Sequence, residues 1–462
     1  MRPARRLTLL AATVVLFVPT ALPPGVTAEA AGPNQVEPGR ESAPVDFTDW
    51  RTPREFGGGT WEGTAPAREN SGKGTGGVEI GEPIGTIEHT EPALGTTRTY
   101  EYGRWTSPLR RPGFDATQLV ASWGATTPSR TWLLVEMRAV TATGARTAWY
   151  GMGRWASGDG DILRTSLPGQ SDAHGRVDVD TFQVADGTLL RGYQLRVTLY
   201  REAGHDVTPR LAMVGAMTSA IPARFTVPTS PPAGAWGIEL PVPRYSQNIH
   251  IGEYPRYGGG GEAWCSPTST QMVVEYWGRK PTEEDLSWVD PSYQDPSVDH
   301  AARFTYDTDY EGTGNWPFNT AYAAGYGLSG HITRLHSLAE LEGYVAKRIP
   351  VITSQSFRAD ELDGAGYGTA GHLMVVVGFT KDGDVIANDP ASSSNDAVRN
   401  IYKRAQFENI WLRTKRYTED GDVASGPGGI AYIITPLRWS PIETSVPSPF
   451  PSRSGPHTRL PG

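Results

Sequence analysis

Cys265 is the only cysteine among the 462 residues of this chain, and its chemical role is the first question that the sequence raises. A lone thiol forms no internal disulfide, which leaves an inert buried thiol, an intermolecular bridge or a reactive nucleophile. The residues that follow favour the nucleophile. Pro267 and small hydroxyl residues come next, and then an apolar stripe at Met272, Val273 and Tyr276 with helical spacing. We therefore expect Cys265 at the N-terminus of a helix, whose dipole stabilises a thiolate.

A nucleophilic thiol needs a base, and His372 is the candidate among the nine histidines. The other histidines lie in a strand-rich region, in the C-terminal tail or in polar, turn-like surroundings, where a solvated or satisfied ring is the simpler interpretation. His372 instead opens the continuous apolar run Leu373–Phe379, which is typical of a buried strand. This arrangement puts the His372 imidazole at the start of a rigid strand.

Asp389 is the candidate that orients this imidazole. The residues Lys381–Asp384 indicate a turn, and the apolar run after it predicts a returning strand that brings Asp389 toward His372. A strictly regular turn would put Asp389 opposite Val376, four residues short of His372. We therefore expect a bulge or a side chain that reaches past the strand end, with Asn388 as the alternative orienting residue.

The last requirement is a donor for the oxyanion of a tetrahedral intermediate, and Gln247 is the candidate. It precedes Cys265 by a short segment, so that its side-chain amide and the Cys265 backbone N–H can form the hole together. A lone Gln is more often a surface residue. The assignment of Gln247 as oxyanion donor therefore depends on the presence of Cys265, His372 and Asp389 in the same sequence. The set predicts a thiol-based site that needs no metal and no cofactor.

The first thirty residues carry targeting signals: three arginines within the first six residues, an apolar run over 7–18 and an A-x-A-like cleavage site over 28–30. This pattern predicts an export signal that is removed near Ala31. No later run reaches the roughly 20 apolar residues of a membrane span, so no membrane association is expected after its removal. We expect the mature protein to be secreted and extracellular.

Shifts in composition divide the rest of the chain. Alternating runs such as 177–182 and 195–199, without a sustained helical period, predict an N-terminal all-β sandwich or jelly roll. Pro- and Gly-rich residues 227–234 indicate a linker, after which capping-box spacings at Thr282 and Ser337 indicate helices among strands, hence an α+β domain. The expected organisation is a signal peptide over 1–31, a disordered lead-in over 32–44, a β-sandwich accessory domain over 45–222, a Pro-rich linker over 223–238, a second domain over 239–438 and a disordered tail over 439–462.

Aromatic content and charge bear on the partners. Half of the 14 tryptophans lie in the β region. Core packing explains such rings more often than stacking on sugars, but aromatic platforms for a cell-wall glycan are the alternative. The net charge is −8 and no Lys/Arg cluster is present, so we expect no nucleic acid as a partner.

Four motifs, in this order, resemble the papain-clan cysteine peptidases related to the bacteriocin-leader peptidases, cysteine peptidase family thirty-nine, in a stand-alone secreted form. They are Val-Pro-x-Tyr-x-Gln at 242–247, Trp-Cys-x-Pro-x-Ser at 264–269, Gly-His-x-x-Val-Val-x-Gly-Phe at 371–379 and Asn-Asp-Pro at 388–390. The resemblance implies a papain-like α+β peptidase domain over 239–438. It also implies that Cys265 is the nucleophile, His372 the base, Asp389 the orienting residue and Gln247 the oxyanion donor.

Two departures limit what the resemblance implies. No ATP-binding cassette or transmembrane segment follows in this sequence, so we do not expect leader processing during export, and Ser266 stands where the family often has Gly. The expected function is hydrolysis of peptide or amide bonds in an extracellular peptide or protein, through an acyl-enzyme. The alternatives are a transamidase or cell-wall amidase with the same triad, or a glycan-binding adhesion protein whose peptidase-like domain is inactive.

Overall fold

The computed structural model describes residues 44–67 and 76–437. These residues all belong to one compact unit. None of their helices combines the length and the apolar character that a membrane span requires. The export signal expected over 1–31, nearly all of the lead-in over 32–44 and the tail over 439–462 lie outside the described residues.

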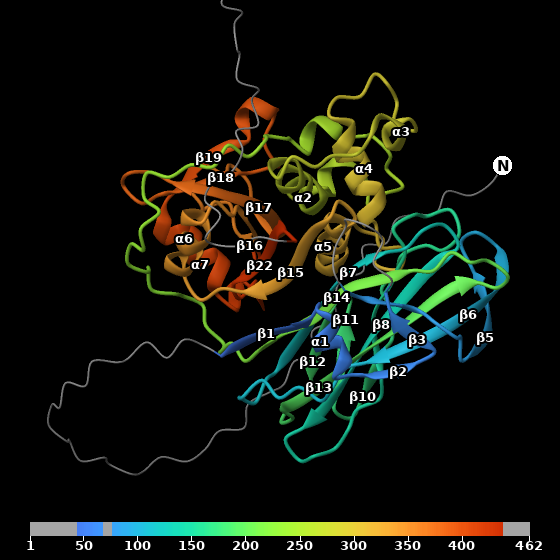
Figure 1. Ribbon diagram of the computed structural model, residues 1–462. Coiled ribbons are helices and arrows are strands. Elements are labelled where there is room, and N and C mark those ends of the chain that lie inside the picture. Colours follow the sequence, from blue (N-terminus) through green and yellow to red (C-terminus); the bar gives the residue numbers. More distant parts are fainter. Residues whose placement is uncertain (1–43, 68–75, 438–462) are drawn as a thin grey trace, which may run out of the picture. The chain divides into compact units, whose positions relative to one another are not determined.

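The N-terminal half is an all-β sandwich of two antiparallel sheets, as the alternating runs predicted (Figure 1). The strands of the first sheet are β1 (Val45–Trp50), β3 (Thr64–Pro66), β4 (Val78–Ile80), β7 (Gln118–Thr126), β10 (Ser171–Asp172), β11 (Gly175–Asp178), β12 (Thr181–Val184) and β14 (Arg210–Ser219). Those of the second sheet are β2 (Thr60–Glu62), β5 (Gly85–Glu91), β6 (Thr96–Thr106), β8 (Thr131–Thr141), β9 (Tyr150–Trp155) and β13 (Leu190–Glu202). The first has the order β10-β11-β12-β7-β14-β4-β3 with β1 on β14, and the second has the order β2-β6-β13-β8-β9 with β5 on β6. One short helix, α1 (Pro53–Gly57), lies between β1 and β2.

Aromatic rings fill much of the sandwich core. Five of the seven tryptophans of this half are buried: Trp50, Trp105, Trp123, Trp132 and Trp155. Rings of this size each remove roughly 150–250 Å² from water, which makes them a main source of the stability of the sandwich. The two partly buried rings are Trp61 and Trp149, and two arginine guanidinium groups lie over Trp149 at 4.5 and 4.2 Å. These positions agree with core packing for most of the tryptophans.

One strand prediction was wrong. Residues 177–182 are not a single strand but the adjoining ends of β11 and β12, which a two-residue turn at Val179 and Asp180 connects. Val179 has a φ of 54°, in the left-handed region that β-branched residues rarely adopt. The turn lacks the Asn-Gly or Asp-Gly pair that marks such hairpins, so the alternating pattern conceals it. Burial of Asp180, which accepts a hydrogen bond from Trp316 N at 2.9 Å, holds the turn instead.

The C-terminal half is an α+β fold around an antiparallel sheet, as predicted. Its strands are β15 (Leu328–Arg334), β16 (Val351–Phe357), β17 (Thr369–Phe379), β18 (Val385–Asn388), β19 (Arg399–Tyr402) and β22 (Ile430–Pro436), in the order β15-β22-β16-β17-β18-β19. Its helices are α2 (Cys265–Tyr276), α3 (Glu283–Leu286), α4 (Pro296–Thr305), α5 (Trp316–Gly325), α6 (Leu338–Ala346) and α7 (Arg404–Leu412). Three 3₁₀ turns (Asn248–His250, Gly261–Ala263, Asn395–Ala397) and a small hairpin of β20 (Lys415–Tyr417) and β21 (Val423–Ser425) complete the described elements.

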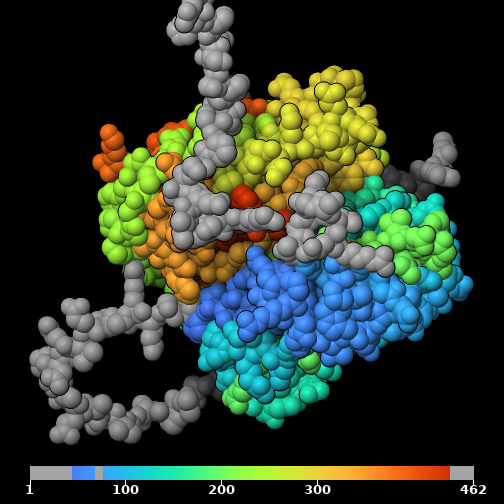
Figure 2. Space-filling view, in the orientation of Figure 1, coloured from blue at the N-terminus to red at the C-terminus, as the bar shows by residue number. Residues whose placement is uncertain are grey.

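The helices surround this sheet. Figure 1 shows α2, α4 and α5 on one side of the sheet and α6 and α7 on the other. The segment that carries α3 and α4, yellow in Figure 2, forms a compact lobe at the surface. The predicted helix caps are present: Thr282 forms a capping box with Asp285 at α3, and the Ser337 side chain accepts from Glu340 N at α6. Local signals therefore determine where these two helices begin.

The two halves share a hydrophobic seam in which α5 and β15 pack on β7. Small residues of β7 permit this close approach, since a Cβ on Gly124 would lie only 3.3 Å from the Cβ of Ala324. Phe318 of α5 belongs to the sandwich core, with its ring centroid 6.0 Å from that of Trp123 and 5.5 Å from that of Trp155. The sandwich and the C-terminal half therefore stabilise each other.

Hydrogen bonds fix the Pro-rich segment 223–238 on the C-terminal half. The backbone N–H of Ser230 donates to Glu408 of α7 at 2.7 Å. The N–H groups of Ala233 and Ala235 donate to Glu342 of α6 at 2.8 and 3.0 Å. Ser230 and Ala235 are buried, so this segment contributes to the packing around α6 and α7.

Replacing Phe318 with Ala tests the shared seam. The cavity left by such a change in a core costs about 3–5 kcal/mol, and we expect the free energy of unfolding to fall by that amount. Urea unfolding followed by tryptophan fluorescence and far-UV circular dichroism measures it. The matched control is Phe225→Ala, whose ring is 37% exposed, with an expected loss of about 1 kcal/mol or less. Equal losses in both variants would contradict the shared core.

Candidate active site

Cys265 is the first residue of α2, as predicted, and it lines a cleft. Trp264 directly before the helix is completely buried, and its Nε1 donates to the Tyr257 carbonyl at 2.6 Å, which fixes the point where the helix begins. Ser266 shares a hydrogen bond of 2.9 Å with the Tyr432 hydroxyl. Because the first N–H groups of a helix have no intrahelical acceptor, this end of α2 stabilises negative charge on the Cys265 sulfur.

His372 lies near the start of β17 and is 4% exposed. Its Nε2 is 2.8 Å from Asp389 Oδ1. The Cys265 side chain interacts with the same imidazole, and Nδ1 is the ring nitrogen that remains for it. Helix α2 packs against β17, and Ser269 Oγ donates to the Leu373 carbonyl at 3.1 Å. This packing holds the thiol and the imidazole next to each other.

A β-bulge brings Asp389 to the face of the sheet that carries His372. The register between β17 and β18 shifts between Val376 and Gly378. Residues directly opposite in an antiparallel pair share a face, and a shift of one residue exchanges the two faces. With the observed shift, one further step of the register pairs Asp389 with Met374, two residues from His372 and on the same face. Without it, Asp389 would continue on the opposite face, so a bulge, one of the two alternatives expected from the sequence, is needed for this contact.

The Asp389 carboxylate is 2% exposed and accepts four hydrogen bonds. His372 Nε2 and the Ala391 N–H lie 2.8 and 3.0 Å from Oδ1, and the hydroxyls of Tyr367 and Tyr402 lie 2.9 and 2.6 Å from Oδ2. Burial raises the pKa of Asp389, but the charge of His372 and these hydrogen bonds outweigh it and hold the pKa below its usual value. The four donors therefore make a buried negative charge tolerable.

The imidazole of His372 remains protonated over a wide range of pH. Burial by itself lowers its pKa, but the Asp389 and Cys265 side chains outweigh burial and raise the pKa to about 10. An imidazolium held against a thiol stabilises the thiolate.

Gln247 lies on the wall of the cleft that Cys265 lines, and it is 3% exposed. Its Nε2 donates to the Glu262 carbonyl and its backbone N–H to the Pro390 carbonyl, both at 2.8 Å. A Cβ on Gly261 would lie 2.3 Å from the Gln247 carbonyl oxygen, so a glycine is required where the two segments meet. The amide NH₂ group carries two hydrogens, and the second is left for a substrate oxygen.

Both halves of the protein line the cleft, which has a volume of about 930 Å³. The C-terminal half supplies Cys265, His372 and Gln247 to its wall, with Asp389 behind His372. The sandwich supplies residues 178–181, the turn between β11 and β12. The sandwich and the C-terminal half therefore form the walls of the same cleft.

The exposed charged side chains on the lining are acidic. They are Asp178 of the sandwich and Glu262 and Glu311 of the C-terminal half. Arg334 also lies on the lining, but it is only 7% exposed and donates to Gln118 and to two backbone carbonyls. These three exposed carboxylates therefore favour cationic groups close to them.

Several residues of the site were not found from the sequence. Tyr367 lies in the loop before β17 and Tyr402 ends β19, and no spacing relates either of them to Asp389. The sandwich turn was missed because its residues were assigned to one strand. Asn388, the alternative orienting residue, does not contact His372: its Nδ2 donates to the Pro243 carbonyl at 3.0 Å.

Comparison with known proteins matches both halves of the chain. Residues 239–419 match the family described as Peptidase_C39 like, and residues 46–219 match the family described as Peptidase C39 N-terminal domain. No curated protein sequence matches the chain.

Two of the solved structures with detectable similarity match different parts of the architecture. A C39-like peptidase from Bacillus anthracis shares 16% identity, with 43% of this chain and 96% of that chain covered and a TM-score of 0.26. The C-terminal family 22 carbohydrate-binding module of Clostridium thermocellum Xyn10B shares 10% identity, with 40% of this chain and 98% of that chain covered and a TM-score of 0.18. From the two family matches and the α+β fold around the cleft, we conclude that this chain belongs to the Peptidase C39-like family, with a C39 N-terminal domain before the peptidase-like domain.

Proposed function

We propose that this protein is a secreted, extracellular cysteine peptidase that hydrolyses peptide or amide bonds through Cys265, His372 and Asp389. The observation that carries the proposal is the buried 2.8 Å contact between His372 Nε2 and Asp389 Oδ1 next to a thiol at a helix N-terminus. Family membership supports a peptide substrate. The arginines and the apolar run over 7–18 support export.

Acylation begins when the Cys265 thiolate attacks the carbonyl carbon of the scissile bond. The carbonyl oxygen becomes negative and accepts hydrogen bonds from the Cys265 backbone N–H and from Gln247 Nε2. The His372 imidazolium gives its proton to the leaving nitrogen, the C–N bond breaks and the amine departs. A thioester on Cys265 and a neutral His372 remain.

Deacylation uses the same groups, with His372 now acting as the base. Neutral His372 takes a proton from water as the water oxygen attacks the thioester carbonyl. The tetrahedral intermediate collapses, the C–S bond breaks, and the carboxylic acid product leaves. The Cys265 thiolate and the His372 imidazolium are restored. Asp389 keeps its charge throughout and holds the ring in orientation.

The acidic lining of the cleft supports a preference for substrates with Lys or Arg side chains or free amines near the scissile bond. Asp178, Glu262 and Glu311 line the same cleft as Cys265. The same feature favours a second candidate function. If an amine takes the place of water in deacylation, the enzyme is a transamidase. If the bond that it cleaves is an amide of the cell-wall peptide, the enzyme is a cell-wall amidase. A cell-wall glycan as a partner of the sandwich stays a prediction.

Alkylation of Cys265 tests the activated thiol. An ordinary thiol, with a pKa of about 8.5, is roughly 0.3% ionised at pH 6 and reacts slowly. We expect iodoacetamide to label Cys265 readily at pH 6 in the full chain, and His372→Ala to slow labelling by on the order of 100-fold. Mass spectrometry of the labelled peptide over time measures the rate. Equal rates at pH 6 in the two proteins would remove the basis for the proposal.

A peptide-library digest compared between the unmodified protein and Cys265→Ala identifies the reaction. Hydrolysis should disappear in the variant, because the acyl-enzyme cannot form. Adding hydroxylamine or a primary amine to the unmodified enzyme distinguishes transamidation, since amide products then appear beside the acids. A library that both proteins leave intact, while the sandwich retains cell-wall glycan, would favour the adhesion alternative.

Asp389→Asn tests the carboxylate through pH dependence. The Asp389 charge raises the pKa of His372, so kcat/KM of the unmodified enzyme should fall on the alkaline side only as His372 loses its proton, near pH 10. Asn keeps the shape of the side chain but removes the charge. We expect the alkaline limb of kcat/KM to move down by about one to three pH units. An unchanged limb would mean that Asp389 does not set the protonation of His372.

Asp178→Asn tests the contribution of the sandwich to specificity. Loss of one exposed ion pair with a cationic substrate residue lowers kcat/KM by about two- to five-fold. We expect that loss for peptides with Lys or Arg and little change for neutral peptides. Asp186→Asn, an exposed carboxylate of the same sandwich outside the cleft, is the control and should leave both rates unchanged.

A further inference from the structure

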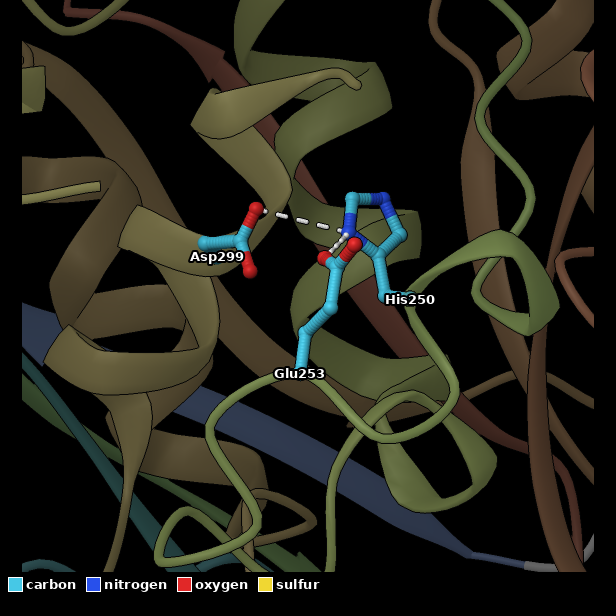
Figure 3. Close-up of side chains that lie close together, drawn as sticks. All are labelled: His250, Glu253 and Asp299. Atoms are coloured by element: carbon cyan, nitrogen blue, oxygen red, sulfur yellow. Dashed lines mark hydrogen bonds and ion pairs between the residues drawn. The ribbon is translucent and has the colours of Figure 1, made fainter. Parts of the chain in front are cut away.

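A second group of chemically active side chains lies outside the candidate active site (Figure 3). His250 Nδ1 is 2.7 Å from Glu253 Oε2 and 3.3 Å from Asp299 Oδ2. The three donor atoms all lie within 4.8 Å of one another. His250 and Asp299 are completely buried, and the Glu253 side chain is 13% exposed. Figure 3 shows His250 and Glu253 reaching in from one loop and Asp299 from a helix, with both carboxylates directed at Nδ1.

The charges of this cluster are not balanced by the protein. Neither carboxylate oxygen of Asp299 has a hydrogen-bond partner, and His250 Nε2 has none either. Nδ1 carries at most one hydrogen and cannot satisfy both carboxylates. Among the residues that the structure describes, no Lys or Arg forms an ion pair with Glu253 or Asp299. With both carboxyl groups ionised, even a protonated His250 leaves one net negative charge, which is strongly disfavoured in a buried position.

Asp389 provides the contrast within the same protein. That carboxylate is also buried, but four donors surround it. Asp299 has no such set, because neither of its buried carboxylate oxygens accepts a hydrogen bond. The difference indicates that a positively charged group is missing from the cluster.

We propose that His250, Glu253 and Asp299 form a binding site for a divalent cation of the zinc type. One imidazole nitrogen and two carboxylate oxygens are a donor set that Zn²⁺ accepts in proteins, with a fourth position left for water. Ca²⁺ prefers six to eight oxygen ligands, so the imidazole and the small number of donors disfavour it.

The spacing of the donor atoms fits this proposal with a small adjustment. Ligand distances of about 2.0–2.2 Å in a tetrahedral site put the donor atoms roughly 3.3–3.6 Å apart. His250 Nδ1 and Asp299 Oδ2 already stand 3.3 Å apart. The 2.7 Å between His250 Nδ1 and Glu253 Oε2 must open by roughly half an ångström, which the partly exposed Glu253 side chain can do by rotation.

The position of the cluster gives the cation a structural role beyond the proposed peptidase chemistry. His250 belongs to the 3₁₀ turn that directly follows Gln247, and Asp299 belongs to α4. A cation bound to both connects the segment that carries the oxyanion donor to a helix of the adjoining lobe. It would limit the motion of Gln247 without contacting the substrate.

Metal binding by the full chain tests the site directly. The Cys265→Ala protein is used, because the thiolate is itself a zinc ligand. After treatment with a chelator, the protein is titrated with Zn²⁺ in a calorimeter, and bound zinc is counted by elemental mass spectrometry after dialysis. We expect one Zn²⁺ per chain and a higher melting temperature with zinc than without it. Asp299→Asn and Glu253→Gln, each in the Cys265→Ala protein, should lose at least about 100-fold in affinity, since even an outer partner of a ligand contributes 10–100-fold.

A matched control separates loss of a ligand from loss of packing. His300 follows Asp299 in α4, is buried and bonds to the Tyr322 hydroxyl at 3.1 Å, and His300→Gln should keep the zinc affinity. Should Asp299→Asn fail to fold, Glu253→Gln still decides the question, because its side chain is partly exposed. The proposal is overturned if Cys265→Ala binds no Zn²⁺, or if zinc affinity survives in both ligand variants. It is also overturned if two results occur together: Asp299→Asn melts at a higher temperature than the Cys265→Ala protein, and zinc does not change the melting temperature of the Cys265→Ala protein. The carboxyl groups of Glu253 and Asp299 would then share a proton.

Discussion

The buried contact between His372 and Asp389 is the interaction on which the candidate site depends. A carboxylate in the core is tolerated only when donors and an opposite charge surround it. Three neighbouring strands meet this requirement: β17 supplies the imidazole, β18 delivers the carboxylate at its end, and β19 supplies the Tyr402 hydroxyl. The order of the three strands at this edge of the sheet therefore sets the order imidazole, carboxylate, hydroxyl in the site.

The thiol reaches this pair because α2 packs on β17. The helix dipole and the imidazolium both act on the sulfur from directions that the packing determines. Buried Trp264 fixes the first residue of the helix, and the close contact at Gly261 brings the Gln247 segment against the turn that leads to Cys265. The nucleophile, its base and the oxyanion donor thus come from elements whose positions depend on one another.

The sandwich shares its core and the cleft wall with the peptidase-like fold. Its β7 is buried on both faces because α5 and β15 cover the outer one, and Phe318 extends into its core. Its β11–β12 turn forms part of the cleft wall, with Val179 in a backbone conformation that is costly for a β-branched residue. Strain of this kind persists only where surrounding contacts impose it, here through the buried Asp180.

The sequence by itself determined the features that local patterns encode. The helix that starts at Cys265, the apolar strand after His372, the hairpin that returns to Asp389 and the all-β character of the N-terminal half all follow from periodicity, turns and caps. The need for either a bulge or a side chain that reaches past the strand end also followed, because register arithmetic left Asp389 short of His372. Only the tertiary structure decided that the bulge lies at Val377 and turns Asp389 to the correct face.

The tertiary structure also decided which distant residues complete the sites. The tyrosines on Asp389, the sandwich turn in the cleft and the meeting of His250 with Asp299 join segments that no local spacing relates. The physical reason is that periodicity records which face of an element is buried, but not which partner buries it. A shift of one residue in a strand, or a different partner for a helix, exchanges these contacts while the local pattern stays the same.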